Sequence, residues 1–187
     1  ALRPFSKKWV ALGVINTFDP LIFTMHCIGI LLWLLGTEPV LTFTVMYIVI
    51  FFYYILRFAL QKAVKTAVHH ELQDEEFVIV APTMRFFHWK VAAKSKTHFY
   101  VGRAYRRSVN IYDKFEIEPI PKTELVEKAL KDPNLDAFLS FSPLYRWEIS
   151  ELESGVTELR LIDLRYRSND RYPFVAVAHL DEELNIV

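Results

Sequence analysis

Two long apolar runs, separated by a short turn, constrain this chain more than any other feature. Residues 20–35 and 40–56 contain no charged side chain. A helix over the first run would be about 24 Å long, slightly less than the roughly 30 Å hydrocarbon core of a bilayer. Between the runs, "GTEP" supplies Gly36 for a helix C-cap and Pro39 for the first turn of a second helix. The sequence therefore predicts a transmembrane helical hairpin, and a buried hairpin in a soluble protein is the less common alternative for runs this long.

The charges around the hairpin predict its orientation. The turn contains no Lys or Arg, whereas basic residues flank both ends, namely Arg3, Lys7, Lys8, Arg57, Lys62 and Lys65. The positive-inside rule then places both ends of the hairpin and everything after it in the cytoplasm. We expect a membrane region over residues 1–68, with an amphipathic interfacial segment at 5–17 and transmembrane helices at about 20–36 and 39–60.

After residue 70 the apolar pattern changes to a period of two, which is typical of half-buried strands. Residues 71–187 therefore predict a soluble domain with an antiparallel sheet and one or two helices, so that the fold class is α+β. The expected strands are 75–82, 85–94, 98–107, 110–119, 144–153, 157–167 and 171–181, and the expected helices are 121–132 and 134–141. With one cysteine, Cys27, the chain can form no internal disulfide.

Asp19 is a carboxylate at the edge of the first apolar run, directly before Pro20. Asp followed by Pro is a good N-cap and first helical residue, so helix capping alone explains the residue type. An ionisable group at membrane depth is also costly and marks a candidate functional site. Capping and metal ligation are compatible, and both remain open for Asp19.

A second candidate site is a run of basic residues without any acid, over residues 85–107. It contains Arg85, Lys90, Lys94, Lys96, Arg103, Arg106 and Arg107, interleaved with aromatic residues. Anionic lipid headgroups attract such a surface, and so does single-stranded nucleic acid. An ordinary solvated sheet face is the simplest alternative, lipid contact comes next, and nucleic acid is third.

The segment "LIDLRYRSNDRYPF" places Asp163, Arg165 and Arg167 on one face of a predicted strand. Arg165 and Arg167 could bind an anion there. A surface ladder of ion pairs is the favoured alternative.

The segments "RPFSKKW", "NTFDPLIF" and "IDLRYRSNDRYPFVAV" resemble a family of membrane-bound bacterial proteins, the YdjM-like family with its YfhP-like branch. Its members are described as metal-dependent hydrolases and as LexA-binding proteins of the inner membrane. The resemblance covers nearly the whole chain. It implies hydrolase activity, a divalent metal ion and a place in the bacterial inner membrane.

The resemblance also implies that this chain is the C-terminal portion of a longer protein. In that family, His-rich and His/Asp polar motifs precede the "PFS" segment, and this sequence has none of them. Asp19 is the one position that matches an expected metal ligand. One carboxylate is too few for a catalytic metal, which normally takes three or more protein ligands, so the other ligands would come from the upstream part of the same protein.

Two functions follow from these features. The first is the C-terminal portion of a membrane-embedded metal-dependent hydrolase, inactive without the upstream ligand helices. The alternative is a membrane-anchored binding or regulatory module, whose basic and aromatic sheet face contacts anionic lipid, nucleic acid or a protein partner.

Overall fold

The computed structural model describes residues 13–152 and 155–187. Most of the predicted interfacial segment, at 5–17, lies outside these residues. The chain divides into two compact units, residues 1–91 with 102–112 and residues 92–101 with 113–187.

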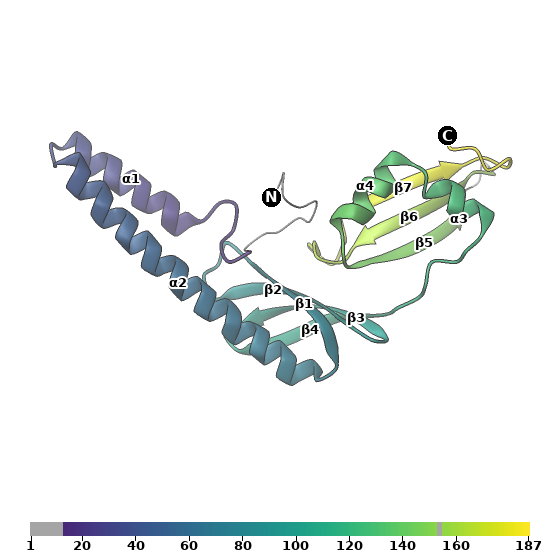
Figure 1. Cartoon of the computed structure of the whole chain (residues 1–187), viewed down its shortest axis with the longest axis horizontal. Helices are drawn as coiled ribbons and strands as arrows, with labels where there is room; N and C mark the ends of the chain where they lie inside the picture. Colours follow the sequence, from purple (N-terminus) through teal and green to yellow (C-terminus); the bar gives the residue numbers. More distant parts are fainter. Residues whose placement is uncertain (1–12, 153–154) are drawn as a thin grey trace, which may run out of the picture. The chain divides into compact units, whose positions relative to one another are not determined.

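Two antiparallel helices form the predicted hairpin, α1 (Pro20–Leu34) and α2 (Pro39–Leu72), drawn in purple and blue in Figure 1. Asp19 caps α1 and Glu38 caps α2, and each cap is followed by proline. The helices approach closely at Gly29, where an added Cβ would lie 3.1 Å from the sulfur of Met46. α2 is long and apolar enough to cross a membrane, whereas α1, at 15 residues, is shorter. Membrane crossing by either helix therefore stays a prediction, and of the two only α2 has the length for it.

The second half of α2 packs against a four-stranded sheet. Its strands follow one another in the order β1 (Glu75–Pro82), β2 (His88–Ser95), β3 (His98–Tyr105) and β4 (Ser108–Glu116). The core between helix and sheet consists of Val64, Val68, Val80, Trp89, Val91 and Ala104. The predicted boundary between membrane and soluble regions, at residues 68–71, thus falls within the last turns of α2, which are part of the first unit.

The second unit contains a three-stranded antiparallel sheet of β5 (Tyr145–Glu151), β6 (Thr157–Asp163) and β7 (Val175–Leu180). Two short helices, α3 (Glu124–Ala129) and α4 (Pro133–Phe141), cover one face of this sheet (Figure 1). The core beneath them consists of Ala129, Leu135, Leu159, Leu161, Ala178 and Leu180. The predicted α+β class is confirmed, with the strands divided between two sheets instead of one.

Candidate functional site

Asp19 joins the two helices of the hairpin at their base. One carboxylate oxygen, Oδ1, accepts the backbone N–H groups of Leu21 at 3.0 Å and Ile22 at 3.2 Å, which is the predicted N-cap. The other oxygen, Oδ2, accepts a hydrogen bond from the hydroxyl of Tyr53 on α2 at 2.8 Å. Asp19 therefore has a complete structural role, in which both oxygens have partners.

Arg57 lies one turn after Tyr53 on α2 and is 1% exposed. Its Nε donates to the carbonyl of Val14 at 2.9 Å, and its Nη1 donates to the carbonyl of Phe86 at 2.5 Å. The guanidinium carbon lies 4.2 Å from the ring centre of Trp89, a cation–π distance. A buried charge is costly unless it is compensated, and these contacts offset part of that cost, whereas the buried Nη2 has no hydrogen-bond partner among the described residues.

Gln61 continues this polar line one turn further along α2. Its side-chain amide donates to the carbonyls of Gly13 at 2.7 Å and Val80 at 2.9 Å. Since Tyr53, Arg57 and Gln61 are spaced by four residues, they lie on one face of the helix. This polar face holds the segment before α1, the last residues of β1 and the β1–β2 turn against α2.

A metal centre is not complete in the residues that the structure describes. Within 13–152 and 155–187, no group of three or more His, Cys, Asp or Glu side chains could hold a metal ion. Near Asp19, His26 bonds to the carbonyl of Ile22 in its own helix at 2.7 Å, and its ring lies 6.0 Å from that of Tyr47 on α2. A resident divalent metal therefore does not fit these residues alone, and ligation by Asp19 stays a prediction.

The seven predicted basic residues occupy strands and turns of the first sheet. Lys90 and Lys94 lie on β2 and Arg103 on β3, whereas the turns hold the others, Arg85, Lys96, Arg106 and Arg107. The four turn residues and Arg103 are exposed, and Lys90 and Lys94 are half-buried. Binding of an anionic surface by this set stays a prediction.

Arg165 and Arg167, the predicted anion site, both pair with acids. β6 ends at Asp163, so Arg165 follows the strand, and its guanidinium makes a bidentate contact with the Asp163 carboxylate. Arg167 donates to Asp113 at 2.5 Å, and Tyr172 donates to the same oxygen at 2.6 Å. The arrangement favours the ion-pair alternative, and anion binding stays a prediction.

The contact with Asp113 also changes the acidity of the Tyr172 hydroxyl. Burial, together with the hydrogen bond to the Asp113 carboxylate, raises the pKa of the Tyr172 phenol above its ordinary value. The phenol therefore stays protonated and remains a hydrogen-bond donor to Asp113 at neutral pH.

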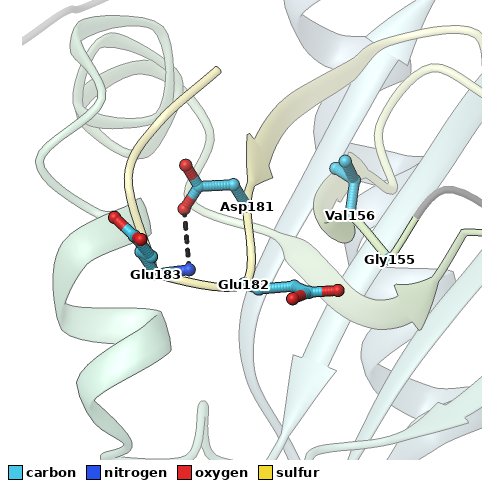
Figure 2. A pocket seen from close by; sticks show the side chains of 5 residues that line it. All are labelled: Gly155, Val156, Asp181, Glu182 and Glu183. Carbon is cyan, nitrogen blue, oxygen red and sulfur yellow. Dashed lines mark hydrogen bonds between the residues drawn. The ribbon is translucent and has the colours of Figure 1, made fainter.

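A shallow pocket in the second unit is lined by acidic residues (Figure 2). Its walls are Gly155, Val156, Asp181, Glu182 and Glu183. Asp181 accepts the backbone N–H groups of Asn185 and Glu183, and these bonds hold the pKa of Asp181 below its usual value. The Asp181 carboxylate thus closes a turn of its own segment, which gives it a local structural role.

Sequence reasoning missed Tyr53, Arg57 and Gln61 as a structural set. The sequence pattern indicates Arg57 only as a basic flank of the hairpin. A usable signal was present, because three polar side chains recur every four residues around the point where the uncharged run of α2 ends.

Comparison with known proteins finds two family regions in the chain, whose bounds differ from those of the two compact units. Residues 73–115 match the family described as "YfhP middle domain", and residues 124–187 match the "YfhP C-terminal alpha/beta plait domain". The chain is 47% identical, over all of its 187 residues, to "Uncharacterized protein YfhP" of Bacillus subtilis (strain 168), and it spans 57% of that protein's length. No solved structure matches the chain. The chain belongs to the YfhP-like family and contains its middle and C-terminal domains.

Proposed function

We propose that this chain is a membrane-anchored module, in which the α1–α2 hairpin inserts into a bilayer and α2 carries the first sheet at the membrane surface. The observation that supports the proposal is the bare apolar surface of the hairpin. Only 17% of the most apolar stretch of α2 is buried, whereas the core helix of a soluble protein would be mostly buried. Exposed apolar side chains include Ile28, Ile30, Leu31, Leu34, Val40, Leu41, Val45, Ile48, Phe51, Phe52 and Ile55.

The dimensions of the hairpin support the same proposal. From Pro39 to Arg57, α2 rises by about 27 Å, close to the roughly 30 Å of a hydrocarbon core. The polar groups of Asp19, Tyr53 and Arg57 gather at the base of the hairpin, where the apolar run ends. In this arrangement the turn around Gly36 lies on the far side, and both ends lie on the near side. The basic flanks favour the cytoplasm of a bacterial cell for the near side.

Extraction of native membranes tests the anchor. The chain should remain in the membrane pellet after treatment with sodium carbonate and with urea. Lysine at two lipid-facing positions, Ile48→Lys with Phe52→Lys, should prevent stable insertion, because a charge at the centre of a span costs about 2.5–3.5 kcal/mol. Thr97→Lys, at an exposed position on the proposed cytoplasmic side, is the control and should insert normally. Quantitative release of the wild-type chain as a monodisperse soluble protein would contradict the anchor.

A second candidate function is that the longer protein, of which this chain is a part, is a metal-dependent hydrolase with Asp19 as one ligand. Asp19 supports it as a partly exposed carboxylate at the hairpin base, together with the sequence resemblance. The described residues cannot hold a metal by themselves, so the further ligands would lie outside them.

Asp19→Asn in the longer protein tests the hydrolase candidate. Asn caps a helix about as well as Asp but is a poorer ligand for zinc or a hard cation. We expect unchanged insertion, with bound metal and any hydrolase activity lowered at least about tenfold.

The chain offers a matched control in Asp132, which caps α4 in the same way and also precedes a proline. Asp132→Asn should leave metal content unchanged. A fully metal-loaded Asp19→Asn variant would restrict Asp19 to its cap and its bond with Tyr53.

A further inference from the structure

Two neighbouring turns at one end of the first sheet form an exposed surface of arginine and apolar side chains. The β1–β2 turn, residues 83–87, contributes Met84, Arg85 and Phe87. The β3–β4 turn contributes Arg106 and Arg107. Met84 is 60% exposed and Phe87 is 37% exposed. We call these five residues the arginine-turn surface.

Hydrogen bonds and ring contacts hold the two turns together. The backbone N–H of Arg106 donates to the carbonyl of Phe87 at 3.0 Å, and the Arg106 guanidinium lies 5.2 Å from the centre of the Phe87 ring. Within the first turn, His88 N–H donates to the Arg85 carbonyl at 3.0 Å. The surface is therefore preorganised, and its arginines have no acid near them in sequence, because residues 85–107 contain none.

The same turns lie beside α2 at the base of the hairpin. Phe86, in the first turn, accepts a hydrogen bond from Arg57, and its ring centre lies 5.9 Å from that of Tyr53. Tyr53 and Arg57 are the residues at which α2 leaves the apolar stretch. If the hairpin spans a bilayer, the arginine-turn surface consequently lies next to the lipid headgroups and within reach of them.

We infer that the arginine-turn surface docks on anionic phospholipid headgroups. The inference rests on the proposed membrane anchor. Guanidinium groups match phosphate oxygens in bidentate hydrogen bonds, and the exposed Met84 and Phe87 side chains would enter the headgroup boundary beside them. Lipid is favoured over nucleic acid because the contacts with Tyr53 and Arg57 place this surface next to the bilayer, where the lipid concentration is high.

A nitroxide at Ser108 reports the docking without changing the five residues. Ser108 is exposed and follows Arg107, and Ser108→Cys in a Cys27→Ser background gives one labelling site. The full chain is reconstituted in vesicles of phosphatidylcholine, with and without 30% phosphatidylglycerol (on the order of physiological anionic content). Collision rates with oxygen and with a nickel chelate give the depth of the label. We expect headgroup depth in the anionic vesicles at low salt, and an aqueous position in neutral vesicles or at high salt.

Removing charges from the arginine-turn surface measures how much its arginines contribute to docking. Because each basic residue near an anionic surface contributes about 1 kcal/mol, Arg85→Gln with Arg107→Gln should lower the ratio of docked to undocked label about thirtyfold. Lys122→Gln with Lys131→Gln, two exposed lysines of the second unit, changes the net charge equally and should leave the ratio unchanged.

These experiments distinguish a failure of the lipid-docking inference from a failure of the proposed membrane anchor. Release of the chain by carbonate would contradict the anchor itself. A chain that resists carbonate but keeps the label aqueous on anionic vesicles would overturn the docking alone, and so would equal depth on neutral vesicles. A single-stranded oligonucleotide could also shift the label from headgroup depth to an aqueous position on anionic vesicles. If it does, and if the Arg85→Gln, Arg107→Gln variant does not respond to the oligonucleotide, the surface binds nucleic acid and the lipid inference is wrong.

Discussion

The hydrogen bond between Tyr53 and Asp19 should contribute a measurable share of the stability of the hairpin. It joins α1 to α2 at 2.8 Å, and Tyr53 is 8% exposed. A hydrogen bond to a charged group contributes about 1.5–3 kcal/mol to stability. Tyr53→Phe should therefore destabilise the chain by about that amount. Asp19→Ala should cost a further 1 kcal/mol or so, because it also removes the N-cap of α1.

A double-mutant cycle isolates the bond. Tyr53→Phe and Asp19→Ala remove the same interaction, so the double variant should be about 1.5–3 kcal/mol more stable than the sum of the two single losses predicts. Unfolding in mixed micelles of a mild detergent and SDS, followed by tryptophan fluorescence, gives the four free energies of unfolding.

Glu38 provides the matched control for this cycle. It caps α2 through Val40 and Leu41, before Pro39, at the opposite end of the hairpin from Tyr53. Glu38→Ala combined with Tyr53→Phe should be additive within about 0.5 kcal/mol. If the Asp19 cycle is additive to the same extent, the carboxylate does not bond to Tyr53 and the base of the hairpin is described incorrectly.

Three further outcomes are expected. The first concerns topology: if the hairpin is inserted as proposed, Thr37→Cys in a Cys27→Ser background should react with an impermeant maleimide on intact cells. Thr97→Cys in the same background should react only after lysis. The reverse pattern would invert the topology. Gly102→Ala should lower the free energy of unfolding by about 1–3 kcal/mol in urea titration, because its Cβ would press on the backbone of the neighbouring strand. Because the pKa of Tyr172 is raised in the folded chain, the unfolded phenol ionises at about pH 10 while the folded phenol keeps its proton, so the free energy of unfolding falls as pH rises above about 10. In urea titrations between about pH 8 and 11, Tyr172→Phe should make this decrease smaller.

Local pattern was sufficient to predict the fold class and many elements. The strand expected at 75–82 is β1 in the structure, and the turn at Gly36 joins the two expected helices. These features depend on alternation, on uncharged runs and on Gly and Pro positions, all of which are local in the sequence.

Arg57 shows why the candidate site was harder to predict. Its burial depends on the carbonyl of Phe86 and the ring of Trp89, about thirty residues away, and no local rule pairs them. Arg165 shows the second reason. It was expected on a strand, but its backbone N–H and its guanidinium both bond to Asp163, a side-chain turn that competes with strand pairing.

The length of α2 also fixes how the hairpin is rotated, about the axis of α2, relative to the sheet. A single buried stripe runs along the helix and consists of Met46, Ile50, Tyr53, Arg57, Gln61, Val64 and Val68. Its first half faces α1 and its second half faces the sheet. One inserted residue would turn one half by about 100° against the other, whereas seven residues, close to two full turns, would nearly restore alignment. Because α2 is continuous from Pro39 to Leu72, a rotation of its apolar half about the helix axis would also turn the sheet that packs on its second half.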